Sequence, residues 1–239
     1  MPESEVWLEQ LNDELPEVQI EKRNLEIVKI CHRARTLLQR INDVESSVYD
    51  VLNMVREMRV LDQTAITWRQ GPNWSFKVMS RSDIFPYDEP VSTFPEIIQL
   101  HHDVWIAYEW NYHRTARILL HEQLLRCLER IRQGCQGQVL TEIDFITQTS
   151  IEIIQSLADD ILSTVPQMFG DIDHQGRPQT LSEASKCRGL GGYFLLWPIK
   201  IVKRSKLAAE EQRHRAEAVF ERIREYTGMK SALGDKSII

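Results

Sequence analysis

The sequence predicts an all-α protein, a multi-helix bundle with a long N-terminal helical segment. Three observations carry this prediction. Glycine and proline are scarce, with 10 and 9 among 239 residues, which favours long helices over a sheet protein with many turns. Apolar residues recur at spacings of three and four along several stretches, the period of one helix face. No run of useful length alternates apolar and polar residues, as a half-buried strand would.

The first segment carries a heptad seam. Between Pro16 and Gly71 the chain has neither glycine nor proline, and apolar residues follow the seam over more than four heptads. They are Ile27, Ile30, Ala34, Leu37, Ile41, Val44, Val48, Val51, Val55 and Met58. Asn42 and Asp43 are residues that commonly begin a helix, so residues 1–70 form either one long helix or a helical hairpin.

The seam is expected to pack inside the chain. It contains no polar residue of the kind that sets the register of parallel dimers. A seam without such a residue is satisfied more easily against the long helix that follows it. An intramolecular bundle is therefore favoured, and a homodimer is the less favoured alternative.

Residues 71–95 are predicted to be a loop, rich in proline and longer than most connections within compact domains. Aromatic side chains indicate that the loop packs on the helices: Trp74, Phe76, Phe85 and Tyr87. Thr93 and Glu96 then have the spacing of a capping box. A helix is therefore expected from residue 96 to about residue 133, where Gly134 ends it.

Three more helical segments are predicted. Residues 141–164 carry apolar residues at helical spacing. The next segment begins at Leu181 and passes through the glycine-rich residues 189–192, where we expect a kink at which backbones approach closely. Residues 206–227 form a charged amphipathic helix. Residues 96–239 are thus expected to form one helical body, and the whole chain one compact domain.

Polar side chains are set into the long helix at positions that otherwise look buried. Arg114 and Arg117 are three residues apart and share a face with large apolar residues, next to Trp110 and Asn111. Arginine in such surroundings must find carboxylate, carbonyl or aromatic partners, because an unpaired buried charge is costly. We predict a polar cluster inside the helical core at these four residues, with Asp160 or its neighbour Asp159 as candidate partners.

Trp197 is the remaining candidate site residue. It precedes Pro198 within an apolar run, and a proline there kinks a helix. With Trp110 close by, such a kink would open an aromatic pocket that could hold a ligand.

The sequence shows no catalytic constellation, and we expect neither a cofactor nor a metal ion. His101, His102, His113 and His121 crowd one helix, but none of them belongs to a Glu-x-x-His pair of the kind that a metal site on a helix uses. The cysteines form no CxxC pair, which argues against a zinc ribbon. They are Cys31, Cys127, Cys135 and Cys187, of which the first two fall on apolar helix faces and are expected in the core.

Charge and hydropathy exclude further classes. The formal net charge is −6, which opposes general binding to nucleic acid. No apolar run approaches the roughly 18 residues of a transmembrane helix. The acidic N-terminus lacks the apolar region of a signal peptide. We expect an intracellular protein of the nucleus or cytoplasm that binds neither membranes nor, directly, DNA.

Three blocks follow one another in the second part of the chain. They are HHDVWIAYEWNYHRTARILLHEQLL at 101–125, IQSLADDILSTVPQMFGD at 154–171, and GGYFLLWPIKIVKRS at 191–205 with FERIREYTGMKSAL at 220–233. Together they resemble the fungal-specific transcription factor domain that lies C-terminal to the DNA-binding cluster of Zn₂Cys₆ regulators. The resemblance spans about residues 74–233.

The resemblance implies a helical regulatory domain that responds to an effector or contacts a protein, without catalytic residues. The family's six-cysteine cluster has no counterpart here, so the chain is either a fragment of a longer regulator or a stand-alone relative, and its own heptad segment favours the latter. We expect a regulatory domain that binds a protein partner or a small-molecule effector. The alternative is an enzyme of fungal specialised metabolism on the same scaffold, with Arg114, Arg117 or a histidine as acid–base groups.

Overall fold

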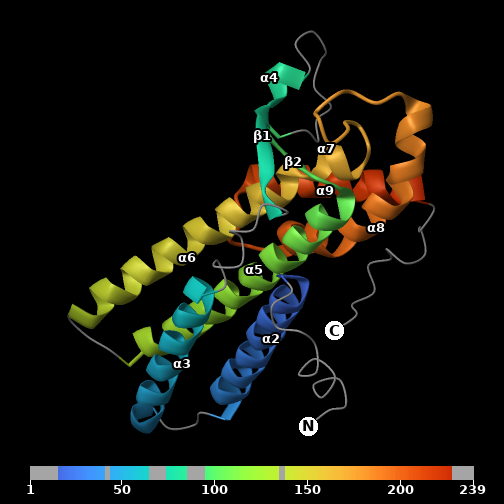
Figure 1. Ribbon diagram of the computed structural model, residues 1–239. Helices are drawn as coiled ribbons and strands as arrows, with labels where there is room; N and C mark the ends of the chain where they lie inside the picture. The colour runs from blue at the N-terminus through green and yellow to red at the C-terminus, as the bar shows by residue number, and fades with distance from the viewer. Residues whose placement is uncertain (1–15, 41–43, 65–73, 85–94, 135–137, 228–239) are drawn as a thin grey trace. The chain divides into compact units, whose positions relative to one another are not determined.

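Helices dominate the computed structural model, which describes residues 16–40, 44–64, 74–84, 95–134 and 138–227 (Figure 1). The predicted all-α class is confirmed. In chain order the elements are α2 (Pro16–Arg40), α3 (Val44–Thr64), β1 (Phe76–Ser80), α4 (Arg81–Ile84), β2 (Ile97–His101), α5 (Val104–Arg132), α6 (Gln138–Ser163), α7 (Val165–Met168), α8 (Leu181–Arg204) and α9 (Glu210–Thr227).

The chain divides into two compact units whose segments alternate along the sequence. The first unit comprises Met1–Pro72 and Ala116–Ile154, and the second comprises Asn73–Thr115 and Gln155–Ile239. The helices α5 and α6 therefore contribute residues to both units. The sequence predicts one compact domain. Both helices continue their apolar spacing across the divisions between the units, so no local change in the sequence marks these divisions.

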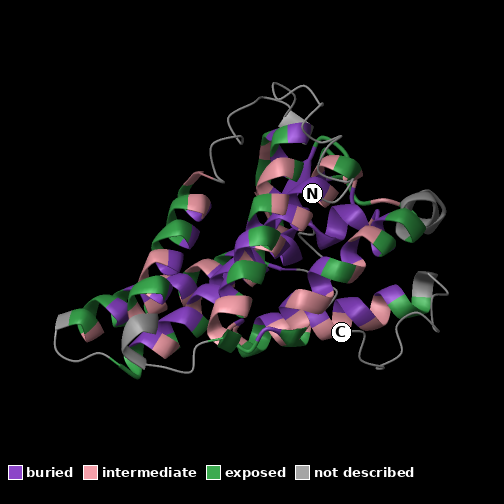
Figure 2. Cartoon of the chain, turned by 90° about the horizontal axis from the view of Figure 1, so that it is seen from below, coloured by how far each residue is buried: buried purple, intermediate pink, exposed green. Residues whose placement is uncertain are grey.

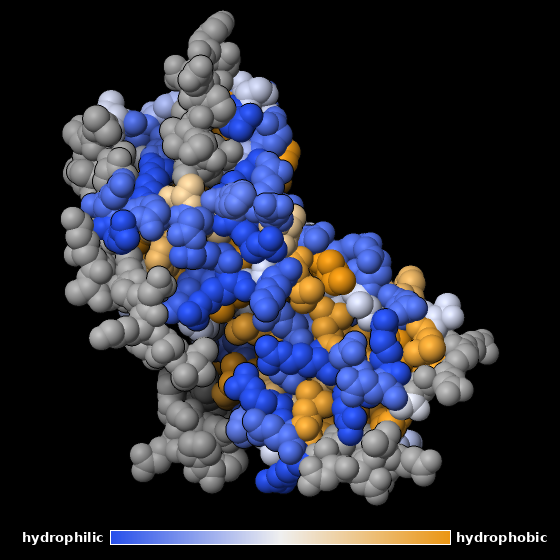
Figure 3. Space-filling model, turned by 180° about the vertical axis from the view of Figure 1, so that it is seen from behind, coloured by the Kyte–Doolittle hydropathy of each residue, from blue (hydrophilic) through white to orange (hydrophobic). Residues whose placement is uncertain are grey.

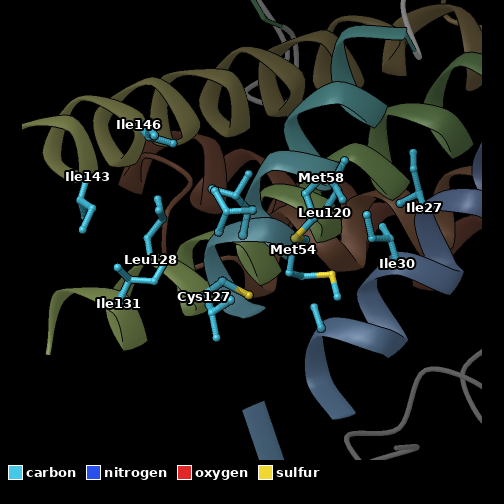
Figure 4. Packing of buried hydrophobic residues seen from close by; sticks show 14 residues of the cluster. Ile27, Ile30, Met54, Met58, Leu120, Cys127, Leu128, Ile131, Ile143 and Ile146 are labelled. Carbon is cyan, nitrogen blue, oxygen red and sulfur yellow. The ribbon is translucent and has the colours of Figure 1, made fainter. Parts of the chain in front are cut away.

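The first unit is a helical bundle built on the heptad seam. The seam is carried by two helices, α2 and α3, which pack against each other. Of the two predicted alternatives, one long helix or a helical hairpin, the structure has the two helices. Its described residues are buried or partly buried in one core with side chains of α5 and α6, among them Leu120, Leu128 and Ile146 (Figure 4). The seam therefore packs inside the chain, as predicted; Ile41 and the side chain of Val44 lie outside the described residues.

Cys31 and Cys127 belong to this core, as predicted. Cys127 is fully buried and Cys31 packs against the same cluster. Burial raises the pKa of both thiols to about 11, so both are neutral at pH 7 and act as small apolar residues. Cys135 and the side chain of Cys187 lie outside the described residues.

The second unit also contains an antiparallel strand pair that the sequence does not predict. Within the described residues, β1 pairs with β2 in the register Phe76↔His101 and Ser80↔Ile97. The predicted loop at 71–95 therefore contains a strand, and the helix expected from residue 96 begins only at Val104. The side chain of Asp103 caps that helix by accepting a hydrogen bond from the Ile106 amide at 2.8 Å.

Burial explains why β2 escaped detection. Four of its five consecutive residues are buried, so apolar and polar positions do not alternate along it. The strand has only five residues, too few for a pattern to stand out. Thr93, the proposed capping residue, lies outside the described residues, as do Phe85 and Tyr87.

The expected close approach at the glycines is confirmed at Gly191. A Cβ atom on Gly191 of α8 would lie 1.7 Å from the Met168 carbonyl oxygen of α7. By contrast, a Cβ on Gly189 would meet nothing within 4 Å. Packing therefore requires a glycine at 191 but not at 189, because any larger residue at 191 would push α7 and α8 apart.

The remaining helices have the amphipathic character that the sequence predicts. Figure 2 shows buried and exposed residues interleaved along the long helices. In the second unit α8 and α9 pack against each other, and Lys203 of α8 forms an ion pair with Glu217 of α9 at 2.8 Å. No described helix is both long and apolar enough to cross a lipid bilayer.

Candidate functional site

Arg114 lies at the centre of a buried network in the second unit. Its side chain is fully buried, and Nη2 donates a hydrogen bond to Gln99 Oε1 at 2.5 Å. Nη1 donates to Asn111 Oδ1 at 3.0 Å and to the Asp160 carbonyl at 3.2 Å. The Asp160 carboxylate lies 3.8 Å from Arg114 Nε and accepts a hydrogen bond from Gln99 at 2.7 Å. The predicted partnership of Arg114 with Asp160 is therefore present.

Trp110 and Asn111 belong to the same network, as predicted. The Trp110 ring lies 5.0 Å from the Arg114 guanidinium carbon and donates a hydrogen bond from Nε1 to the Trp74 carbonyl at 3.1 Å. Asn111 Nδ2 donates to Thr164 Oγ1 at 2.7 Å. These contacts tie α5 to the end of α6 and to the segment before β1. These hydrogen bonds hold the connected segments of the second unit together.

His101 lies beside this network, a position that the sequence does not distinguish from those of the other histidines of the same segment. It is buried against Phe76 and Trp110, with ring centroids 5.1 and 6.3 Å away. Neither ring nitrogen has a hydrogen-bond partner. Burial, helped by the charge of Arg114, lowers the pKa of His101 to about 3, so the ring is neutral at physiological pH.

Arg117 belongs to a different network, in the first unit. Its Nε and Nη2 donate to the two carboxylate oxygens of Asp62 at 2.6 and 3.0 Å. His121 Nε2 lies 3.3 Å from Asp62 Oδ2, and all three side chains are buried. The sequence predicted one polar cluster for Arg114 and Arg117, whereas the structure gives each arginine its own carboxylate partner and its own unit.

The electrostatics of Asp62 follow from these contacts. Burial alone would raise the pKa of Asp62, but the neighbouring His121 and the hydrogen bonds and charge of Arg117 outweigh it and hold that pKa well below its usual range. The carboxylate is therefore ionised and neutralised by Arg117. Asp62 was missed from the sequence, although it follows Met58 of the seam by four residues and so lies on the same helix face.

A cleft of about 140 Å³ opens beside Asp62 and His121, among α3, α5 and α6 of the first unit. Its walls are mainly apolar, formed by Leu124, Phe145, Ile146 and Ile153. Polar side chains also line it, namely Arg59, Asp62, Gln63, His121, Thr149 and Ser150. It is thus a small apolar hollow with a polar side at which charged and hydrogen-bonding groups converge.

His121 gives this cleft an unsatisfied polar group. Its side chain is only 5% exposed; Nε2 lies 3.3 Å from Asp62 Oδ2, whereas Nδ1 has no hydrogen-bond partner. A buried polar atom without a partner costs about 1–3 kcal/mol. Such a cost is tolerated at sites where a ligand supplies the missing partner.

Trp197 does not join either network or the cleft. It is 46% exposed on α8, while Trp110 is 3% exposed in the core of the second unit. Neither tryptophan lines the cleft. The two therefore occupy different environments, and the aromatic pocket expected from the Trp197-Pro198 kink is not the site that the structure presents.

A group of partly exposed aromatic residues lies elsewhere on the second unit. Figure 3 shows hydrophobic side chains in small groups among hydrophilic ones on one face of the molecule, and isolated exposed apolar residues of that kind are normal. The aromatic cluster of α5 and α8 is more concentrated: Tyr108 and Phe194 have ring centroids 4.5 Å apart, and Trp105 lies 5.6 Å from Phe194. Trp105 and the adjoining Tyr193 are 54% and 59% exposed.

Metal binding finds no support within the described part of the chain, where no three histidine, cysteine or acidic side chains come together as ligands.

Comparisons of this chain with protein-family models, with curated proteins and with solved structures returned no match.

Proposed function

We propose that this chain is a non-catalytic regulatory protein that binds a small-molecule effector, comparable to the effector domain of the fungal Zn₂Cys₆ regulators that its sequence blocks resemble. The observation that carries the proposal is the cleft of the first unit. Small-molecule sites are typically mostly apolar hollows with a few convergent polar groups, and this cleft combines apolar walls with the unpartnered Nδ1 atom of the buried His121. A regulator of this kind acts in the nucleus.

Coupling between ligand and protein follows from where the cleft lies. Its lining comes from α3, α5 and α6, whose packing also forms the core around the heptad seam. A ligand that fills the cleft would therefore stabilise one arrangement of these helices over others. Differential binding to two arrangements is what an effector needs to change the state of a regulator.

The same geometry argues against the enzymatic alternative. Ser150, His121 and Asp62 line one cleft and are the residue types of a nucleophilic triad. However, no hydrogen bond joins His121 to Ser150, and Asp62 is paired with Arg117 through two hydrogen bonds. Hydrolysis of p-nitrophenyl acetate should therefore be the same for the wild type and for Ser150→Ala; a loss of activity in that variant would favour the enzyme.

The proposal is tested by tethering the whole chain to a DNA-binding domain of known specificity in a fungal host. Reporter transcription should differ from that given by the DNA-binding domain alone. Thr149→Trp, which fills the cleft, should remove that difference, whereas the matched Gln148→Trp on the exposed face should keep it. No difference for the wild-type chain contradicts a role in transcription.

A protein partner is the second candidate, favoured by the exposed aromatic cluster of the second unit. Trp and Tyr residues in a contiguous exposed group often anchor protein interfaces. In the same reporter assay Trp105→Ala and Tyr193→Ala would then reduce the response, while Tyr49→Ala, an equally exposed aromatic outside the cluster, would not. Wild-type reporter responses in all three variants would rule out this surface as the binding site of a protein partner.

A further inference from the structure

We infer that the cleft of the first unit selects a small aromatic carboxylate, with the ring between the apolar walls and the carboxylate at Arg59. This inference rests on the proposed effector-binding function and names the class of ligand. Three properties of the cleft lead to it: its size, its charge and the hydrogen-bond donors at its polar side.

The size of the cleft fits one six-membered ring. Its volume is about 140 Å³, and an apolar protein cavity of roughly 150 Å³ is known to accommodate benzene. Leu124, Ile146 and Ile153 supply aliphatic surface, and Phe145 supplies an aromatic face. A flat ring would contact this surface well.

The charge of the cleft favours an anion. Asp62 is the acidic residue of the lining, and Arg117 neutralises it through two hydrogen bonds. Arg59 then supplies the uncompensated charge, because it is exposed and has no ion pair or hydrogen bond within the described residues. A guanidinium group matches a carboxylate in shape and can donate two parallel hydrogen bonds to it.

The hydrogen-bonding groups point to the same ligand. The Nδ1 atom of the buried His121 ring has no hydrogen-bond partner, and the buried Ser150 supplies a hydroxyl to the same lining. Both can donate to a carboxylate oxygen. Thr149 cannot add a donor without losing a bond, since its hydroxyl already donates to the Phe145 carbonyl at 2.9 Å. A ligand ammonium group would find no free carboxylate in this lining.

The test uses three probes with the same ring and different charge: benzoate, benzyl alcohol and benzylammonium. Each is titrated into the ¹⁵N-labelled full chain at pH 7 and followed by amide shifts. Benzoate should bind saturably, with shifts confined to the cleft segments of α3, α5 and α6. It should bind at least about tenfold more tightly than the other two, the scale of one charge-assisted pair.

Arg59→Gln should reduce benzoate affinity to the level of benzyl alcohol, because the ion pair is lost. Arg56→Gln is the matched control: Arg56 lies on the same helix, is exposed and does not line the cleft, so affinity should be unchanged. Equal binding of the three probes, unchanged affinity in Arg59→Gln, shifts outside the cleft or no binding by about 10 mM benzoate would each overturn the inference.

The two proposals fail separately. If benzoate does not bind but Thr149→Trp still abolishes the reporter response, the ligand class is wrong and the effector function stands. If benzoate binds as described but the tethered chain leaves transcription unchanged, the carboxylate site stands and the regulatory function is wrong.

Discussion

Arg117 holds Asp62 through two parallel hydrogen bonds, Nε to Oδ1 at 2.6 Å and Nη2 to Oδ2 at 3.0 Å, across 55 residues of sequence. The pair joins α5 to α3 within the first unit, and its Asp62 lines the cleft. With side chains only 7% and 11% exposed, the two charges depend on each other, because neither is solvated by water.

Removing one member of this pair should destabilise the protein strongly. Asp62→Ala leaves the guanidinium of Arg117 buried without its carboxylate, and breaking a buried pair in this way typically costs about 3–5 kcal/mol. The double variant Asp62→Leu/Arg117→Met leaves no buried charge and should recover most of that loss. Urea unfolding of the single variants Asp62→Leu and Arg117→Met and of the double variant measures the coupling; single variants within about 0.5 kcal/mol of the wild type would show that the pair is exposed.

Arg114→Met should cost less than the loss of Asp62. The substitution removes the hydrogen bonds that Arg114 donates to Gln99 Oε1 and Asn111 Oδ1. The cost is limited because the Asp160 carboxylate is 33% exposed and water can solvate it. We expect a loss of about 2–4 kcal/mol. Arg126→Met, an exposed position on the same helix, is the control and should leave the melting temperature unchanged. Equal melting of both variants would mean that the network around Arg114 contributes little.

Two glycines of α8 should respond to alanine in opposite directions. Gly191→Ala places a methyl group 1.7 Å from the Met168 carbonyl oxygen, so α7 and α8 must separate and the melting temperature should fall sharply. Gly189→Ala meets nothing and should stabilise the helix by roughly 0.5–1 kcal/mol. Calorimetry of both variants checks this; a tolerated Gly191→Ala would contradict the close contact of α7 and α8.

His101 should make the protein sensitive to mild acid. Its pKa is about 3 in the folded state and about 6.5 in the unfolded chain. The unfolded chain therefore gains a proton first, so this group favours folding fully above pH 6.5 and loses that contribution as pH falls towards 3. The free energy of unfolding should decrease by up to about 1.4 kcal/mol per pH unit over this range.

His101→Phe tests this dependence because it keeps a ring and removes the proton site. The variant should lose less stability than the wild type between pH 7 and pH 5, whereas His102→Phe, whose side chain is 85% exposed in the wild type, should behave like the wild type. Parallel pH profiles for wild type and His101→Phe would show that the pKa of His101 is not lowered in the folded protein.

Features that depend on the residues of a single helix could be predicted from the sequence. The seam residues, the core cysteines and the close approach at Gly191 could be read from spacing and residue type, because each depends on one helix face. The strand pair could not, since β2 is buried along most of its length and shows no alternation. Pairing partners were the hardest to predict: Arg114 and Arg117 look alike in sequence, yet their carboxylates, Asp160 and Asp62, come from different helices and different units.

The central claim is that the cleft of the first unit controls the activity of the chain as a regulator. The most direct measurement is the ratio of reporter transcription between tethered Thr149→Trp and tethered Gln148→Trp, two neighbouring substitutions of which only the first fills the cleft. With both variants equally stable and equally abundant, we predict that the Gln148→Trp chain acts like the wild type and that the Thr149→Trp chain acts like the DNA-binding domain alone. A ratio of one, with both variants as active as the wild type, would contradict the account.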